Sequence, residues 1–325
     1  MEINTTEKLR IYLKEANVEY ESLQRLEGGT ANFVWRLVIA SGNTMIIKHA
    51  EQYVASSAGQ MPFPVDRMDF ENAALKTVPD YVINKQSVGV PKVFWYDGAD
   101  HVLSIEDGGL RNLKAAYDDQ SLDIQKVGRY LGRWLSDLHA NTKTAGIGDN
   151  KTAKAIYRYS YANVPGVLER YGHDPALGEQ VNEQYGSLLQ TDDECVCHGD
   201  FWPGNVLVEG QKLTVVDWEM VRRSCGATDV GQFAAEAYLL DKFKGGRGLL
   251  QRFLSAYRED TNSDARFLQR VAIHMGVHLA FWPTRVHWGT EDETRECVEV
   301  GNELMMRALG DENGWASDSL LKDLL

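Results

Sequence analysis

The sequence predicts an α+β protein of two lobes: an N-terminal antiparallel sheet with one helix, and a larger, mainly helical C-terminal lobe. Short runs of β-branched and aromatic residues, separated by turns that contain glycine, recur within residues 1–108. Apolar residues at helical spacing dominate residues 109–325. A chain of 325 residues is long enough to form two lobes with a substantial core between them.

The N-terminal lobe begins with a helix and two strands. Apolar residues at helical spacing predict a helix over residues 6–16. Residues 23–26 and 33–39 have the composition of strands and are joined through Gly28 and Gly29. Because glycine has no Cβ, backbone N–H groups in such a loop can approach phosphate groups closely. A glycine pair alone is more often a simple turn, and this one gains weight from the strand that follows.

That third strand, over residues 44–48, ends in Lys48. A helix is predicted over residues 66–77, ending before Pro79, with Glu71 facing away from its apolar stripe. In protein kinases a strand lysine contacts the α- and β-phosphates of the nucleotide and pairs with a glutamate on the following helix. Lys48 and Glu71 occur in the matching order, and a solvated surface glutamate is the alternative for Glu71.

Two further segments complete the predicted N-terminal lobe. Residues 51–64 are rich in Ser, Ala, Gly and Pro and have no periodicity, which fits either a mobile flap beside the nucleotide or a plain surface loop. Residues 92–96 and 101–105 form a hairpin, because two apolar runs meet at a turn that contains Asp97 and Gly98. Polarity and glycine content rise directly after the hairpin, and the boundary between the two lobes is placed there.

The C-terminal lobe is predicted to contain helices over residues 123–140, 230–240 and 268–282. His274 and His278 lie four residues apart on the last of these helices. The glutamate of the H-E-x-x-H zinc motif is missing between them, so a zinc site is not indicated. Packing in the core is favoured for both histidines, and lining of a pocket is the alternative.

The most specific pattern of the chain is His198-Gly199-Asp200, followed by Asn205 and Asp217. An Asp and an Asn at this spacing match the catalytic loop H-x-D-x-x-x-x-N of kinases. There the Asp accepts the proton of a substrate hydroxyl and the Asn binds magnesium, roles expected for Asp200 and Asn205. A hairpin would return Asp217 beside Asn205, and Glu219, on the same face of an extended segment, can reach a second metal ion. An Asx-rich turn before an ordinary hairpin is the alternative.

Residues 198–219 resemble the signature of the aminoglycoside phosphotransferase and choline kinase family, which phosphorylates hydroxyl groups of small molecules. Residues 26–35 and 46–50 resemble the nucleotide loop and the lysine strand of this family. Residues 278–295 are similar to fungal members that include hydroxytryptamine kinases, and methylthioribose kinases share the broad pattern. The resemblance covers most of the chain and implies a protein-kinase-like fold. Its motifs are specific for the reaction but not for the acceptor.

The resemblance implies a nucleotide site between the lobes. Mg-ATP would lie under Gly28, Gly29 and Thr30, with Lys48 and Glu71 beside its phosphates. The adenine would be held by the backbone of the connection between the lobes, from Ile105 to Asp107.

Three further residues are expected to support the catalytic loop. The family pattern implies that His198 is a scaffold for Asp200 rather than the base, and that Asp229 anchors the backbone of the loop. His139 follows the apolar stripe of the helix over residues 123–140 and is expected to be a structural histidine behind the loop.

Candidates for binding the acceptor come from side-chain chemistry alone. Trp282, Arg285 and Trp288 surround Pro283 and can close over a substrate ring or cation. Glu236, on the helix over residues 230–240, can neutralise an amine.

Composition limits the class of partner. A formal charge of −13 and a pI near 5.1 argue against binding to nucleic acids or anionic membranes, which would repel the chain. No apolar run is long enough to span a membrane, and the N-terminus lacks an apolar signal core. The four cysteines have no zinc-finger spacing, so reduced thiols in a cytoplasmic protein are expected.

The predicted function is an ATP- and Mg²⁺-dependent transfer of the γ-phosphate to a hydroxyl of a small molecule, such as an amine-bearing alcohol, a sugar or a phenol. A protein kinase is disfavoured because Asp217-Trp218-Glu219 replaces D-F-G and no A-P-E-like segment follows. The absence of G-x-x-x-x-G-K-[ST] excludes a Walker-type NTPase. A catalytically silent pseudokinase or binding module is the alternative. The acceptor, and the preference for ATP over GTP, stay open.

Overall fold

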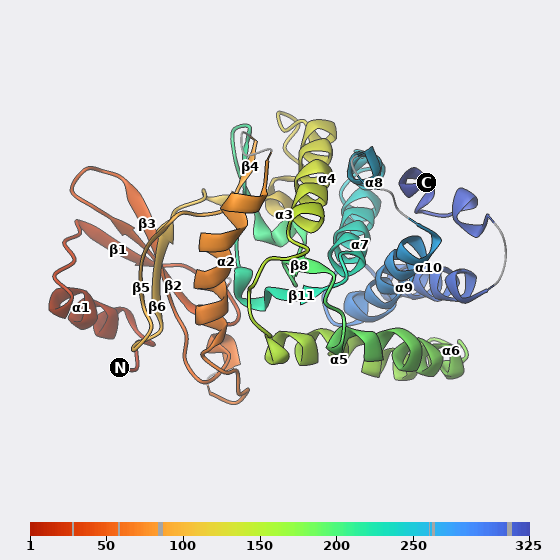
Figure 1. Ribbon diagram of the computed structural model, residues 1–325, viewed down its shortest axis with the longest axis horizontal. Coiled ribbons are helices and arrows are strands. Elements are labelled where there is room, and N and C mark those ends of the chain that lie inside the picture. Colours follow the sequence, from red (N-terminus) through yellow and green to blue (C-terminus); the bar gives the residue numbers. More distant parts are fainter. Residues whose placement is uncertain (28, 58, 84–86, 260, 262–263, 311–313) are drawn as a thin grey trace.

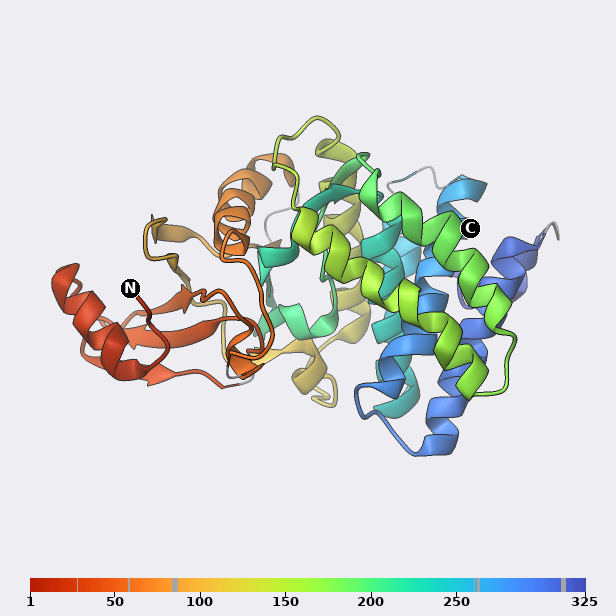
Figure 2. The ribbon, with the colours of Figure 1, turned by 90° about the horizontal axis from the view of Figure 1, so that it is seen from below.

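The computed structural model describes the chain from Met1 to Leu325, apart from residues 28, 58, 84–86, 260, 262–263 and 311–313. An antiparallel sheet and its leading helix form one end of the molecule, and most of the helices form the other (Figure 1). The view from below shows the same division (Figure 2). The predicted α+β, two-lobed architecture is therefore confirmed.

The N-terminal sheet has five antiparallel strands in the order β1-β2-β3-β6-β5. Its strands are β1 (Ser22–Arg25), β2 (Phe33–Val38), β3 (Thr44–His49), β5 (Val93–Asp97) and β6 (Val102–Glu106). Helix α1 (Thr6–Glu15), capped by the Thr5 side chain, packs its apolar stripe against this sheet. All five strands and the helix agree with the predicted elements.

Helix α2 (Arg67–Tyr81) lies between the sheet and the helical lobe (Figure 1). The prediction that it ends before Pro79 is wrong, because the helix continues through this proline. Pro79 lies in the last turn, where only one hydrogen bond is lost, and the adjacent Val78 and Val82 are buried in the main core. Burial of these two valines thus offsets the tendency of proline to end a helix.

The remaining strands form two small sheets in the orders β4-β10-β9-β7 and β11-β8. They are β4 (Val88–Gly89), β7 (Arg111–Asn112), β8 (Cys195–Cys197), β9 (Val206–Glu209), β10 (Lys212–Val215) and β11 (Arg222–Ser224). The β9–β10 hairpin is the one predicted from the sequence. Strand β4 precedes the proposed boundary after residue 108, yet it pairs in parallel with β10.

The C-terminal lobe is built mainly from helices that share one large apolar core. They are α3 (Leu113–Ala116), α4 (Ile124–Asn141), α5 (Lys151–Arg170), α6 (Pro175–Val181), α7 (Ala227–Phe243), α8 (Leu249–Glu259), α9 (Ala265–Phe281) and α10 (Glu291–Leu309). Helices α4, α7 and α9 agree with the three predicted helical ranges to within three residues at each end. Among the helices of the described residues, none combines the length and apolarity needed to cross a membrane.

Helices α4 and α8 pack unusually closely at Gly132. A Cβ at this position would lie 2.4 Å from the backbone oxygen of Phe253 and 2.9 Å from the Cβ of Ala256. Both atoms belong to the α8 helix, whose backbone cannot move without disturbing the core around it. The absence of a side chain at Gly132 therefore sets the distance between these two helices.

We expect Gly132→Ala to lower the free energy of unfolding by about 1–3 kcal/mol, because the added methyl group overpacks the contact between the helices. The matched control is Gly166→Ala in α5, where a Cβ would meet nothing within 4 Å. That substitution should raise stability by up to about 1 kcal/mol through helix propensity. Urea unfolding of both variants measures the difference, and equal effects would contradict the packing argument.

Candidate active site

The catalytic loop follows β8 and is held by one buried carboxylate. Asp229, on α7, accepts hydrogen bonds from the backbone N–H groups of His198 at 2.7 Å and Gly199 at 3.0 Å. Gly199 has a φ of 88°, and a Cβ there would lie 2.0 Å from the backbone oxygen of Met220. Only glycine fits this turn, which delivers Asp200 to the cleft between the lobes.

The Asp200 carboxylate is oriented by two amide side chains. Gln232 Nε2 donates to Oδ1 at 2.7 Å, and Asn205 Nδ2 donates to Oδ2 at 2.9 Å. Burial raises the pKa of Asp200, although the charge of His198 and these hydrogen bonds oppose the shift. Sequence reasoning missed Gln232, because it lies 32 residues from Asp200 and belongs to no local motif.

Lys48 lies at the centre of an ion triad. Its Nζ donates to the two carboxylate oxygens of Glu71 at 2.7 and 2.6 Å and to Asp217 Oδ1 at 2.7 Å. Burial alone would lower the pKa of Lys48, but the two carboxylates raise it well above its ordinary value. Burial would likewise raise the pKa of Asp217, whereas Lys48 holds it below its ordinary value. The expected partnership of Lys48 with Glu71 is present in the structure.

The segment after Asp217 is not extended, contrary to the prediction. Asp217 adopts a left-handed conformation with φ 68°, and Trp218–Met220 form a turn of 3-10 helix. The cause is Trp218, whose fully buried ring donates its Nε1–H to the backbone oxygen of Val215 at 3.0 Å and draws the chain inward. The position of Glu219 is therefore not the one expected from an extended segment, in which Glu219 would share a face with Asp217.

Glu219 is engaged with side chains of the N-terminal lobe. Its Oε2 accepts a hydrogen bond from Asn32 Nδ2 at 2.7 Å and lies 3.4 Å from Arg67 Nε. Burial and the neighbouring charge of Asp217 raise the pKa of Glu219 to about 8. Neither Asn32 nor Arg67 was singled out from the sequence, since both contacts join residues far apart in the chain.

A cleft of about 500 Å³ lies between the lobes. The lining of the cleft includes eight described residues that the sequence predicted to bind the nucleotide, to bind the metal or to act in catalysis. They are Gly29, Thr30, Lys48, Ile105, Asp107, Asp200, Asn205 and Asp217. The predicted nucleotide residue Gly28 lies outside the described residues. Glu71 and Glu219 are buried and do not belong to this lining. The loop predicted as a flap lies beside the cleft, where the N–H groups of Ala55 and Ser56 donate to the backbone oxygens of Ala31 and Thr30.

The connection between the lobes is pinned by Asp107. Its carboxylate pairs with the Arg36 guanidinium through Nε and through Nη2, the latter at 3.0 Å, and accepts the N–H of Gly109 at 3.2 Å. Although burial opposes it, this pairing lowers the pKa of Asp107. The Asp107 side chain is thus committed to Arg36 of β2.

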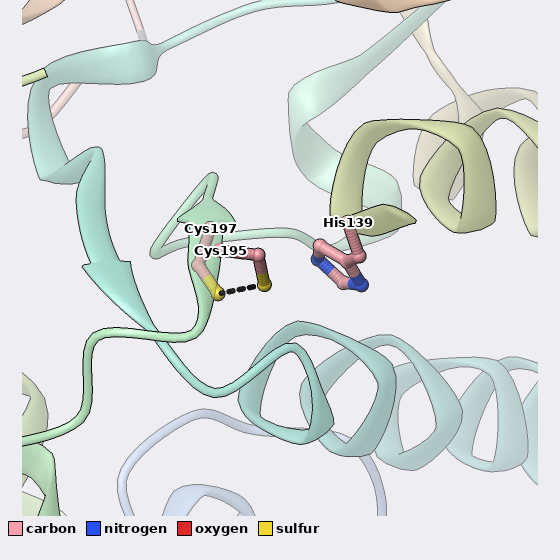
Figure 3. Close-up of side chains that lie close together, drawn as sticks. All are labelled: His139, Cys195 and Cys197. Carbon is pink, nitrogen blue, oxygen red and sulfur yellow. Dashed lines mark hydrogen bonds between the residues drawn. The ribbon is translucent and has the colours of Figure 1, made fainter. Parts of the chain in front are cut away.

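Behind the catalytic loop, His139 lies beside two cysteines of β8 (Figure 3). The Sγ atoms of Cys195 and Cys197 are 3.9 Å apart, and both cysteines are free thiols. The ring nitrogens of His139 are engaged with the Tyr257 hydroxyl at 2.9 Å and with Asp229 Oδ2 at 3.4 Å. Burial would lower the pKa of His139, but hydrogen bonds to Asp229 and Cys197 raise it to about 9. Its surroundings are those of a structural histidine.

The residues suggested for acceptor binding have two different sets of neighbours. Trp282 and the Arg285 guanidinium pack on the ring of Phe281. Trp288 instead packs on Phe243, and Lys114 Nζ lies 3.9 Å from the centre of its ring. Ring contacts among the described residues therefore do not join these side chains into the single cluster expected around Pro283.

The two histidines of α9 are both buried and hydrogen-bonded. His274 contacts the hydroxyl groups of Tyr157 at 2.7 Å and Tyr161 at 3.0 Å, as expected for a packed residue. His278 Nε2 lies 2.8 Å from Glu236 Oε1, so Glu236 is paired on one of its two oxygens.

The chain resembles known phosphotransferases in sequence, and its fold resembles theirs. A 4-hydroxytryptamine kinase of Psilocybe cubensis is 25% identical over 367 residues, covering 99% of this chain and 98% of that protein. A macrolide 2'-phosphotransferase of Brachybacterium faecium has a TM-score of 0.55 and 16% identity, covering 94% of this chain and 100% of its own. An amicoumacin kinase in complex with AMP-PNP and Ca²⁺ has a TM-score of 0.56 and 12% identity, covering 93% of both chains.

Fold and relatives together define a class of protein, the small-molecule kinases with a protein-kinase-like fold. The chain belongs to the phosphotransferase enzyme family, whose sequence profile matches residues 22–272. It is therefore an enzyme that transfers a phosphoryl group to a hydroxyl of a small molecule. The family recognised from the sequence motifs is confirmed, and the catalytically silent alternative finds no support in these relatives.

The His139–Asp229 pair predicts a pH dependence of stability. The pKa of His139 is raised from 6.5 in the unfolded chain to about 9 in the folded one, so its protonated form stabilises the fold fully below pH 6.5. This contribution is lost as the pH rises through about 9. Urea unfolding across this pH window should show a decline in the wild type that is weaker in His139→Gln. His287→Gln, at an exposed position, should retain the decline of the wild type.

Proposed function

We propose that the protein transfers the γ-phosphate of Mg-ATP to the hydroxyl of a small molecule bound beside Asp200. The observation that carries this proposal is the convergence of Lys48, Asp200, Asn205 and Asp217 on one cleft. In this proposal Gly28, Gly29 and Thr30 cover the phosphates, and the backbone from Ile105 to Asp107 receives the adenine. The relative in complex with AMP-PNP supports ATP as the phosphoryl donor.

The residues that face the cleft suit a magnesium ion. Asn205 uses its Nδ2 on Asp200, which leaves the amide oxygen for another partner, and the Asp217 side chain is 38% exposed. Carboxylate and amide oxygens are the ligands that Mg²⁺ prefers in proteins. We therefore assign the metal to Asn205 and Asp217, and a bound Mg²⁺ would neutralise the charge of the phosphates. A role for Glu219 toward a second ion would require it to leave Asn32 and Arg67.

The other steps of the proposed reaction are carried out by side chains of the protein. Asp200, fixed by Gln232 and Asn205, aligns the acceptor oxygen with the γ-phosphorus and takes the proton of the hydroxyl. The new bond joins the acceptor oxygen to phosphorus, while the bond between that phosphorus and the departing ADP oxygen breaks. Lys48 holds the phosphates in place with its positive charge. Positioning and charge neutralisation supply most of the rate in this kind of reaction.

Acceptors of the proposed reaction are amine-bearing alcohols, sugars or phenols. A relative acts as a 4-hydroxytryptamine kinase, and the charge of −13 favours cationic or neutral acceptors over anionic ones. We also propose a cytoplasmic location, which agrees with four free cysteines and with the supply of ATP there.

The test of this function is ADP release from Mg-ATP with a panel of hydroxylated amines, sugars and phenols. Asp200→Asn should lower turnover of any active acceptor by about 100-fold or more, because the amide cannot take the proton. Asp80→Asn, at an exposed position of α2, is the matched control and should retain full turnover. Undiminished turnover in Asp200→Asn would overturn the assignment of Asp200 as the proton acceptor.

Metal dependence provides a separate prediction. Chelation by EDTA should abolish ADP release in the wild type, and added Mg²⁺ should restore it. Asp217→Ala should stay inactive at any Mg²⁺ concentration while retaining a cooperative unfolding transition, because it loses a metal ligand rather than a part of the core. Turnover by Asp217→Ala with Mg²⁺ as the sole divalent ion would remove Asp217 from the metal site.

A further inference from the structure

Within the described part of the chain, Glu236 has one carboxylate oxygen without a partner, and the residue lies on the helix that also carries Gln232, the partner of Asp200. It lies four residues after Gln232 on α7, which places it one helical turn, about 6 Å, further along the helix that positions Asp200. The residue is 7% exposed, and while His278 contacts Oε1, Oε2 has no hydrogen-bond partner among the described residues. A buried carboxylate oxygen without a donor is costly, so this atom favours a ligand that supplies one.

The neighbourhood of Glu236 already holds an ammonium group. Lys114 Nζ lies 3.9 Å from the ring centre of Trp288 and 5.2 Å from that of Trp202. Trp202 also lines the cleft that contains Asp200. Burial lowers the pKa of Lys114, and Glu236 is the neighbouring charge that opposes this shift. Lys114 Nζ therefore lies over the faces of the two tryptophans, and the charge of Glu236 is near enough to act on it.

We propose that Glu236, Trp202 and Trp288 form the binding site for an ammonium group of the acceptor, and that Lys114 holds the place of this group until the acceptor binds. The proposal rests on the proposed function, since it takes the acceptor hydroxyl to lie at Asp200. It narrows the acceptor class to small molecules that carry an ammonium group as well as the reacting hydroxyl.

Three features make an ammonium the best occupant. Aromatic faces attract cations, and desolvated sites strengthen this attraction. Glu236 Oε2 accepts hydrogen bonds, which an ammonium donates and a carboxylate or phosphate cannot. Lys114 is carried on a flexible four-carbon stem, so it can withdraw from the tryptophans without movement of the backbone.

An opposite role for Lys114 makes the proposal testable. If Lys114 served as a binding group for an anionic part of the acceptor, its removal would weaken binding. If it holds the place of the acceptor ammonium, its removal abolishes a competitor and binding becomes tighter. The sign of the effect therefore distinguishes the two roles.

The experiment is isothermal titration calorimetry in the presence of Mg²⁺ and AMP-PNP, which prevents turnover. The probes are tyramine and tyrosol, which share a phenol and a two-carbon arm and differ only in an ammonium or a hydroxyl at its end. Glu236→Gln should weaken tyramine binding by about tenfold or more and leave tyrosol nearly unchanged. Lys114→Met should tighten tyramine binding by about fivefold, because no cation must be displaced.

Two controls keep the test independent of folding. Lys126→Met removes another lysine that lies over an aromatic ring, 5.6 Å from the centre of Tyr130 on α4, and should leave both affinities unchanged. Glu236→Gln conserves the volume of the side chain, and an unchanged melting temperature without ligand confirms that the variant is folded. Trp288→Leu, at a partly exposed position, should weaken tyramine more than tyrosol and serves if Glu236→Gln does not fold.

Equal effects of Glu236→Gln on both probes, or weaker tyramine binding by Lys114→Met, would overturn the proposal. These measurements do not depend on phosphoryl transfer. Tyramine binding with the predicted variant pattern, in the absence of ADP release from ATP by any acceptor, would therefore refute the proposed function while leaving the ammonium site intact. Turnover of neutral acceptors without selective tyramine binding would refute the ammonium site alone.

Discussion

The buried ion pair between Lys48 and Glu71 is the interaction on which the geometry of the cleft depends. It joins β3 to α2, and the contact of Lys48 with Asp217 extends it to the catalytic hairpin, 169 residues further along the chain. Charges this deeply buried are stable only when they are paired, and loss of one partner typically costs about 3–5 kcal/mol. Because Asp217 belongs to the C-terminal lobe, the lysine that we propose contacts the phosphates also ties the two lobes together.

A second buried carboxylate, Asp229, holds the backbone of the catalytic loop. It receives the two N–H groups of the catalytic loop, and His139 of α4 supports it from the other side. Gln232, one turn later on α7, then orients Asp200. A single helix therefore fixes the backbone of the loop and the direction of its carboxylate, and its next turn presents Glu236. In the proposed mechanism, one helix thus serves both catalysis at Asp200 and recognition of the acceptor at Glu236.

Local patterns predicted the parts of the site that lie close together in the sequence. The spacing of Asp200, Asn205 and Asp217 and the order of Lys48 and Glu71 were visible because each depends on one motif or one element. Partners such as Gln232, Arg36 and Lys114 were not predicted, since they meet the site only through the packing of distant helices and strands. The left-handed turn at Asp217 was not predicted, because an aspartate in this conformation is harder to recognise in a sequence than a glycine. The turn is imposed by the burial of Trp218.

Strand β4 gives the two lobes a second connection in addition to the segment around Asp107. The chain enters the C-terminal sheet at Val88–Gly89, returns to build β5 and β6, and crosses again after Glu106. The two lobes are therefore joined at two places, β4 and the segment around Asp107, and two joints restrain their relative rotation more than one joint would. We expect the cleft to open by rotation about the line that joins β4 to the segment around Asp107. Such a rotation would admit a nucleotide and, on closure, bring Lys48 back to Asp217.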